Sequence, residues 1–283
     1  MSDYVRRVGV LDAPIASRLA QLDIELTERC DNDCIHCCIN LPAGDAAARA
    51  REMTTEQVED ILRQAADLGC LSVRFTGGEP LLRPDFEDLY GGARRLGLAV
   101  LLFTNARRIT PELADLLARM PPRELVEVTV YGMHQESYEA VSRVPGSYAQ
   151  FRRGVDLLLE REVPFVVKGA LLPPNRAEID VFEAWARTIP WMTKSPDYAM
   201  FLGLRDRRND PAKNRLIASL RVSPQDYKRV YQSGLLDGVE DASQKNRIAQ
   251  RQQRLGKSHS ARIPGCEDYR SDAGAIWIHG GSR

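Results

Sequence analysis

The chain has 283 residues, with 39 Lys and Arg against 39 Asp and Glu, so its formal net charge is +0. This balance argues against broad nucleic-acid binding, which needs an excess of basic residues. The composition, 43% hydrophobic and 28% charged, is that of an ordinary globular protein. No apolar run approaches the ~18 residues of a membrane span, and the first residues lack a signal-peptide pattern. We therefore expect a cytoplasmic protein with no nucleic-acid or membrane partner.

Short apolar runs recur along most of the chain. Each is rich in Val, Ile, Leu or Phe, which is typical of parallel strands that are covered on both faces. Taken in chain order, the predicted strands are 20–27, 71–76, 99–104, 125–131, 164–172 and 198–204.

Helical patterns lie between these strands. The first has a capping box of the Thr-x-x-Gln type at Thr54 or Thr55, and Gly69 marks its end. The next two begin with Asp85 and with Thr110, which precedes a proline. The predicted helices are 53–69, 83–97, 109–120, 146–162 and 175–189.

Six successive β-then-α units predict an α/β fold with a parallel sheet and right-handed crossovers. The sheet either closes as a partial barrel or stays open as a doubly wound sheet. In both cases function gathers at the carboxyl ends of the strands. We expect an N-terminal segment at 1–17, the β/α domain at 18–206 and a helical, basic extension at 207–283.

Residues 242–265 contain six Lys or Arg and no acidic residue. A solvated helix or tail explains such a run, and a dock for an acidic peptide or partner is the alternative.

Four of the six cysteines lie within eleven residues, and Cys30, Cys34 and Cys37 have the spacing C-x3-C-x2-C. Clustered thiols in a reducing compartment bind metal or do redox work. Zinc would need a fourth ligand, and His36 and Cys38 are awkwardly close to Cys37 for that role. A [4Fe–4S] cluster normally takes four cysteines, so three would leave one iron open to a ligand. The spacing favours a reactive iron–sulfur cluster, with zinc and a structural role as alternatives.

A second motif follows the second predicted strand. Gly77 and Gly78 allow the backbone to approach a ligand closely, because no side chain intervenes. Glu79 then offers a carboxylate to an ammonium group.

The C-x3-C-x2-C loop after the first strand and the Gly-Gly-Glu-Pro run after the second resemble the radical S-adenosylmethionine (SAM) superfamily. The alternating β/α pattern extends this resemblance over 18–206. It implies a partial (β/α)6 barrel, TIM-like and open on one side for the substrate.

The resemblance also implies a chemistry. The three thiolates would hold a [4Fe–4S] cluster, and the amino and carboxylate groups of SAM would chelate the fourth iron. One electron, from a donor such as flavodoxin or ferredoxin, would cleave SAM reductively to methionine and a 5′-deoxyadenosyl radical. That radical would abstract hydrogen from a substrate, while the protein supplies orientation and excludes water.

Further positions match the family one at a time. Thr104 and Asn105 look like its third-strand Thr-Asn and would contact SAM. Thr129 takes the place of a serine that hydrogen-bonds SAM in relatives. Lys168 lies where some relatives pair a lysine with the SAM carboxylate, although it could instead extend to the barrel mouth.

One position departs from the family pattern. Ala140 stands where many relatives have an arginine, and Arg143 lies about one helical turn further on. Arg143 is therefore the predicted substitute for that contact to SAM.

The segment after the fourth strand resembles relatives that modify ribosomally made peptides. Many of these continue into a cysteine-rich extension called SPASM, of which Cys266 alone would remain here. The extension is then either lost or truncated. Three functions stay open: a radical SAM enzyme acting on a peptide or protein side chain, the same chemistry on a small molecule in cofactor or natural-product biosynthesis, and a non-catalytic metal- or partner-binding protein.

Overall fold

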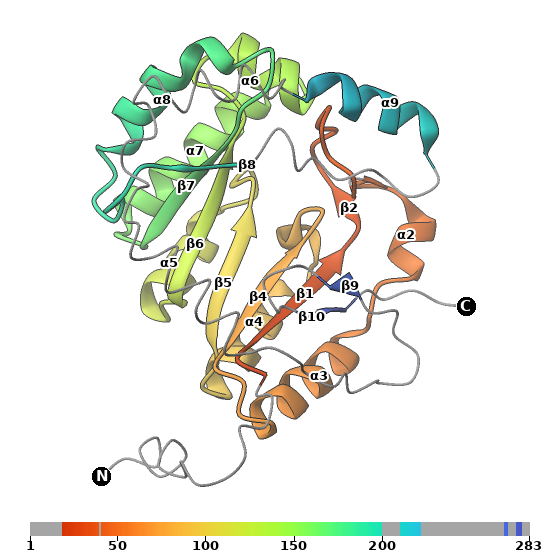
Figure 1. Cartoon of the computed structure of the whole chain (residues 1–283). Helices are drawn as coiled ribbons and strands as arrows, with labels where there is room; N and C mark the ends of the chain where they lie inside the picture. Colours follow the sequence, from red (N-terminus) through yellow and green to blue (C-terminus); the bar gives the residue numbers. More distant parts are fainter. Residues whose placement is uncertain (1–18, 40, 200–209, 222–268, 271–275, 279–283) are drawn as a thin grey trace, which may run out of the picture.

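Six parallel strands form the centre of the molecule (Figure 1). The computed structural model describes residues 19–39, 41–199, 210–221, 269–270 and 276–278. Within these residues the central sheet runs in the order β8-β7-β6-β5-β4-β1, and each neighbouring pair is parallel. This confirms the predicted α/β fold. The strands are β1 Gln21–Thr27, β4 Ser72–Gly77, β5 Ala99–Thr104, β6 Arg123–Val130, β7 Phe165–Ala170 and β8 Asp197–Ala199.

The five predicted helices lie between the strands, and two helices that were not predicted, Ala46–Ala50 and Gln135–Ser142, lie there as well. They are α2 Ala46–Ala50, α3 Thr55–Asp67, α4 Phe86–Arg95, α5 Pro111–Arg119, α6 Gln135–Ser142, α7 Ser147–Glu160 and α8 Ile179–Ala186, with the 3-10 turns η1 Pro80–Leu82 and η2 Arg176–Glu178. Thr54 and Gln57 form the capping box of α3, and Thr110 caps α5. Asp85 is the N-cap residue of α4, as predicted, although its side chain makes no cap hydrogen bond. Its carboxylate instead binds Arg83 and the hydroxyl of Thr55.

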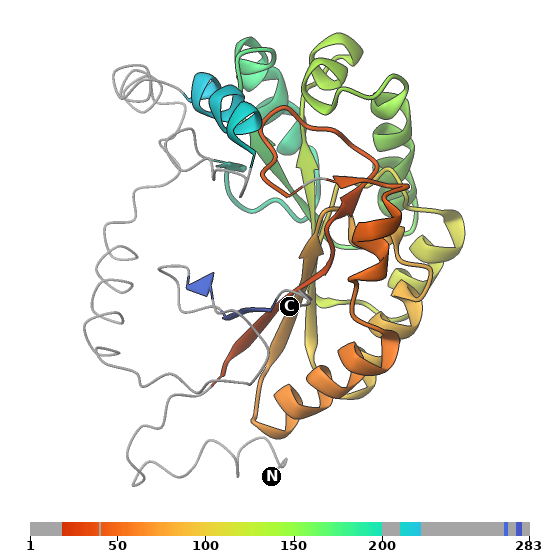
Figure 2. The ribbon, with the colours of Figure 1, turned by 90° about the vertical axis from the view of Figure 1, so that its right-hand side faces the viewer.

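The helices cover one face of the sheet and leave the other to the barrel interior, as Figure 2 shows. In β1 the residues Leu22, Ile24 and Leu26 belong to the hydrophobic core beneath the helices. Since side chains alternate along a strand, Asp23 and Glu25 lie on the opposite, inner face.

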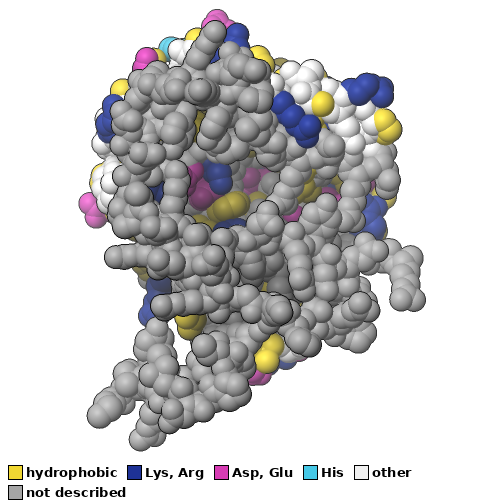
Figure 3. Space-filling model, in the orientation of Figure 1, with side chains coloured by type: hydrophobic (Ala, Val, Ile, Leu, Met, Phe, Trp, Pro, Cys, Tyr) yellow, Lys and Arg dark blue, Asp and Glu magenta, His cyan; other side chains and the backbone are white. Residues whose placement is uncertain are grey.

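The inner face carries paired charges. Asp23 binds Arg74 at 2.8 Å, and Glu127 binds Lys168 at 3.3 Å. The cations of Arg74 and Lys168 lie 4.8 and 5.5 Å from the ring centre of Phe103. Figure 3 shows acidic, basic and hydrophobic side chains side by side near the centre of this face. The barrel interior is therefore suited to polar ligands.

The extension beyond residue 206 contains helix α9 (Pro211–Leu220), as the sequence predicts, and two strands that it does not predict. β10 (Ile276–Ile278) pairs in parallel with β1, and β9 (Tyr269–Arg270) pairs antiparallel with β10. Such short strands depend on pairing with a distant edge, which leaves little local signal. The segments 1–17 and 242–265 and residues 200–204 of the last predicted strand lie outside the described residues, and the domain limits remain a prediction. No helix among the described residues is long and apolar enough to cross a membrane.

Helix α7 touches the loop after β5 at a glycine. A Cβ on Gly154 would lie 1.9 Å from the carbonyl oxygen of Ala106, whereas one on Gly92 in α4 would meet only side-chain ends at 3.9 Å. We predict that Gly154→Ala destabilises the protein by about 1–3 kcal/mol through overpacking. Gly92→Ala should instead stabilise it by about 0.5–1 kcal/mol, because alanine favours helices. Urea unfolding of both variants measures this, and a stabilised Gly154→Ala would contradict the close packing.

Candidate functional site

The cysteine loop begins where β1 ends. The two-residue strand β2 (Arg29–Cys30) continues from β1 and pairs with β3 (Leu41–Pro42). Cys34 is 3% exposed, and the other two cysteines of the motif are partly exposed. The backbone amides of Asn32 and Ile39 donate to the sulfurs of Cys30 and Cys37 at 3.3 and 3.5 Å. Hydrogen bonds from amides to sulfur favour the charged thiolate over the thiol. The loop backbone therefore favours the form of cysteine that binds metal.

Gly77 and Gly78 bring the end of β4 against this loop. A Cβ on Gly77 would lie 2.3 Å from the carbonyl oxygen of Thr27, and one on Gly78 would lie 2.1 Å from that of Arg29. Gly77 also has φ +130°, a conformation that L side chains rarely adopt. The close approach in this structure is therefore to β1 and β2, and it fixes the strand that leads into Cys30.

Glu79 is a buried junction between three segments. Its side chain, in a residue that is 1% exposed, accepts hydrogen bonds from Thr104 Oγ1 at 2.9 Å, the Asn105 amide at 2.8 Å and the Leu81 amide at 3.1 Å. Burial, and then the nearby Asp31 carboxylate, raises the pKa of Glu79 to about 7 against the opposing effect of these bonds. The predicted contact of Glu79 with an ammonium group remains a prediction.

Asn105 and two arginines extend the junction to the cysteine loop. The Asn105 side-chain amide donates to Asp31 at 2.8 Å, and Arg108 binds the same carboxylate at 3.0 Å. Arg107, whose side chain is 7% exposed, donates to Asn32 Oδ1 at 2.6 Å and to the backbone carbonyl of Asp31. The loop after β5 is therefore hydrogen-bonded to Asp31 and Asn32, which lie between the first two cysteines of the motif.

The other side of the loop is also held. Arg29 binds Glu52 at 2.6 Å and the carbonyl of Ala43 at 2.8 Å, which ties β2 to the segment around α2. The amides of Asp33 and Ile35 donate to backbone carbonyls at the end of α6, at 2.9 and 3.0 Å.

The three cysteines of the motif lie on one loop, and amides are directed at the sulfurs of two of them. Among the described residues no three His, Cys, Asp or Glu side chains are arranged to hold one metal ion. In a cubane each cysteine binds a different iron, so the sulfurs need not converge on one point. The three thiols on one loop, with amides directed at two of them, fit a [4Fe–4S] cluster.

A profile of the Radical SAM superfamily matches residues 24–185, which include the cysteine loop and Glu79. The chain belongs to the radical SAM superfamily.

Several curated relatives share this region. The AdoMet-dependent heme synthase of Methanosarcina barkeri is 27% identical over 206 residues, covering 73% of this chain and 55% of the relative. The PqqA peptide cyclase of Streptomyces rochei is 46% identical over 106 residues, or 38% of this chain and 28% of the relative. The mycofactocin maturase MftC of Mycobacterium ulcerans is 34% identical over 148 residues, or 52% and 37%. The chain thus spans about half, or less, of each of these relatives.

A solved structure agrees in fold. The histidine-tagged anSMEcpe with bound AdoMet superposes with a TM-score of 0.57 at 18% identity, covering 77% of this chain and 59% of that chain. This likeness shows a shared fold of the radical SAM barrel type.

The remaining predicted SAM contacts have other partners in this structure. Lys168, with a side chain 31% exposed, binds Glu127 inside the barrel, and Thr129 is its register partner on β6. Arg143 ends α6 in a left-handed conformation and binds Asp33 at 3.0 Å. Hydrogen bonds therefore join Glu79, Thr104 and Asn105 into one group. Among the described residues, Thr129, Arg143 and Lys168 are not bonded to that group.

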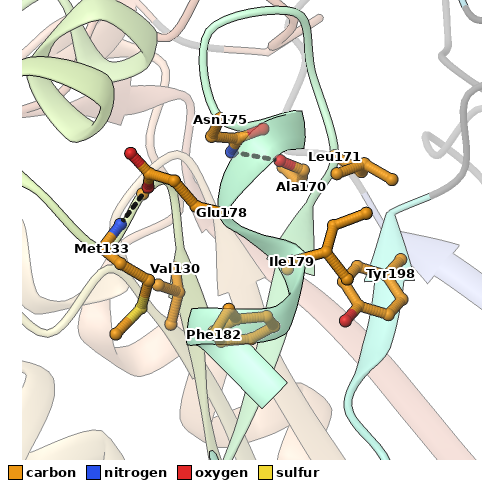
Figure 4. A pocket seen from close by; sticks show the side chains of 11 residues that line it. Val130, Met133, Ala170, Leu171, Asn175, Glu178, Ile179, Phe182 and Tyr198 are labelled. Carbon is orange, nitrogen blue, oxygen red and sulfur yellow. Dashed lines mark hydrogen bonds between the residues drawn. The ribbon is translucent and has the colours of Figure 1, made fainter. Parts of the chain in front are cut away.

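An apolar pocket lies at the carboxyl ends of β6 and β7, against α8 (Figure 4). Val130, Met133, Ile179 and Phe182 line it. Glu178 on its rim already accepts the Met133 amide at 2.6 Å. Val130, Met133 and Phe182 also belong to the hydrophobic core, so the pocket lies in the layer between the sheet and the helices.

Sequence reasoning missed Asp31, Arg107 and Lys213. Asp31 lies between two cysteines, and Arg107 follows the recognised Asn105 by two residues, so proximity to motifs was their only local signal. Lys213 donates to the carbonyl of Cys34 at 2.9 Å from 179 residues away, and no local pattern marks it.

The raised pKa of Glu79 makes a testable prediction about pH. A carboxyl that titrates near 4.5 when unfolded and about 7 when folded holds an extra proton in the folded state between these values. Stability should therefore fall as pH rises through this window, by roughly 1–3 kcal/mol. Glu79→Gln, which cannot titrate, should lack this fall. Urea unfolding of the iron-free protein from pH 4.5 to 7.5 measures it, and parallel pH profiles for the two proteins would contradict the assignment.

Proposed function

We propose that this protein is a radical SAM enzyme that modifies a side chain of a ribosomally made peptide or of a protein. The observation that carries the proposal is the cysteine loop held at the carboxyl edge of the sheet by Glu79, Asn105 and Asp31. Membership of the superfamily supports the same chemistry.

In this proposal Cys30, Cys34 and Cys37 hold the [4Fe–4S] cluster. Together, the bound cluster and SAM supply the one-electron cleavage that generates a radical able to abstract hydrogen. Binding of metal requires thiolates, and burial raises the pKa of Cys30 and Cys34. Loading of the loop should therefore release protons.

SAM would lie along the same edge of the sheet. Its amino group is assigned to the Gly77–Glu79 segment, and its other polar groups to Thr104, Asn105 and Thr129. For Lys168 or Arg143 to reach the SAM carboxylate, each must share or leave its present partner, Glu127 or Asp33. The protein's contribution is orientation of SAM and exclusion of water from the closed side of the barrel.

Peptide substrates are supported by relatives that are named peptide cyclases and peptide-product maturases. The heme synthase relative covers 73% of this chain, so a small-molecule substrate is the second candidate. An anaerobic reaction with candidate peptides encoded beside the gene, followed by mass spectrometry, separates the two. A peptide whose mass falls by the mass of hydrogen supports the peptide substrate. Unchanged peptides together with conversion of a small molecule support the small-molecule substrate. The electron is assigned to a donor such as flavodoxin or ferredoxin.

The cluster assignment predicts different results for neighbouring cysteines. Cys34→Ala should lose the cluster, whereas reconstituted wild type should bind about four irons. Cys38→Ala is the matched control: Cys38 packs against a small hydrophobic cluster that includes Val141 and Leu172, so this variant should keep its iron. Iron analysis and chromatography for 5′-deoxyadenosine after addition of SAM and dithionite measure both effects. Zinc in place of iron in the wild type would overturn the proposal.

Lys168 tests the SAM site. If Lys168 binds the SAM carboxylate, Lys168→Met should weaken SAM binding to the iron-loaded protein roughly tenfold, the value of one charge-assisted hydrogen bond. Glu127→Gln neutralises the present partner of Lys168 and should not weaken binding. Isothermal titration with SAM measures both. Equal affinities for all three proteins would confine Lys168 to its pair with Glu127.

A further inference from the structure

Helix α9 covers the cysteine loop from outside the family domain. It begins after Asp210, beyond the residues that the superfamily profile matches, and Figures 1 and 2 place it beside the loop that follows β2. Its buried residues Ile217 and Leu220 belong to a separate hydrophobic cluster, against which Ile35 and Cys38 of the cysteine loop pack. The helix is therefore part of the surroundings of the loop.

The first turn of α9 places a cation on the loop. Lys213, with a side chain 11% exposed, donates from Nζ to the carbonyl oxygen of Cys34 at 2.9 Å. The same carbonyl accepts the amide of Cys37 at 3.2 Å. The ammonium thus sits on the turn that contains two of the three cysteines of the motif.

The acidic neighbour of Lys213 neutralises it only in part. The Asp33 carboxylate lies 3.9 Å from Nζ, has a side chain 53% exposed, and binds Arg143 more closely at 3.0 Å. A nearly buried ammonium is costly, and an apolar residue at such a position is often equally or more stabilising. The stability of α9 alone does not account for a lysine here.

A positive charge beside a metal group favours the state with more electrons. Reduction of a [4Fe–4S] cluster adds one negative charge, and nearby charge and solvent exposure set its potential. In a partly buried site this interaction is screened less than at the surface. Lys213 holds this position through its hydrogen bond to the backbone carbonyl of Cys34.

We propose that Lys213 is a positioning residue that raises the reduction potential of the cluster and so eases its one-electron reduction. The inference rests on the proposed cluster at Cys30, Cys34 and Cys37. It adds a contribution from a helix that the superfamily profile does not include.

The test compares midpoint potentials of the reconstituted full chain, poised with dithionite and followed by the electron paramagnetic resonance signal of the reduced cluster. Lys213→Met should shift the one-electron equilibrium toward the oxidised form about tenfold, equivalent to about 59 mV. Lys213→Arg, which keeps the charge, should restore the wild-type value. Lys194→Met is the matched control, because Lys194 is 71% exposed and pairs with Asp197; its potential should equal that of wild type.

The outcomes separate this inference from the proposed function. Wild type that takes up no iron would defeat both. Wild type with a cluster and Lys213→Met at the same potential would overturn the role of Lys213 alone. If Lys213→Met loses its iron, Lys213→Gln is measured in its place, with the same negative shift expected. Loss of iron from both neutral variants but not from Lys213→Arg would assign Lys213 to cluster retention and overturn the effect on potential.

Discussion

The site depends on the contact between the end of β4 and the β1–β2 segment. Two backbone hydrogen bonds make it: the Gly78 amide donates to the carbonyl of Thr27 at 2.7 Å, and the Glu79 amide donates to that of Arg29 at 2.8 Å. Neither glycine has room for a Cβ. Any other residue would push β4 away from the strand that ends in Cys30. The glycines of the motif therefore act on the cysteine loop through the backbone, in addition to any contact with a ligand.

From this contact, hydrogen bonds lead in an unbroken series to the cysteine loop. Glu79 accepts from the Asn105 amide, Asn105 donates to Asp31, and Arg107 closes the series on Asp31 and Asn32. A buried carboxylate with a raised pKa is tolerated because each of its oxygens has a donor. Such a series rigidifies a loop that would otherwise carry three thiols on irregular backbone, and a preformed loop loses less entropy when it binds its cofactor.

Sequence patterns predicted what is determined locally. The strands and helices follow from short-range periodicity and caps, and the cysteine and Gly-Gly-Glu motifs are contiguous. Gly77 and Gly78 allow close approach of a strand that lies about fifty residues earlier in the chain, and the motif alone does not reveal which segment approaches. Asp85 occupies the N-cap position of α4, but its carboxylate accepts a hydrogen bond from Arg83 and none from the amides of the helix. Lys213 and the strand β10 are non-local in the same sense, since only folding brings them to the cysteine loop and to β1.

The position of α9 bears on where the catalytic core ends. A boundary at residue 206, drawn from the end of the β/α pattern, would separate Ile217 and Leu220 from Val141, Ala170 and Leu172, with which they share a buried cluster. That cluster also contacts Ile35, so its loss would uncover apolar surface on the cysteine loop itself. The carbonyl of Cys34 would at the same time lose the Lys213 ammonium and keep only the Cys37 amide as a donor. The β/α repeat thus defines the strand and helix order of the domain. The residues that pack around the cysteine loop, however, include those of α9.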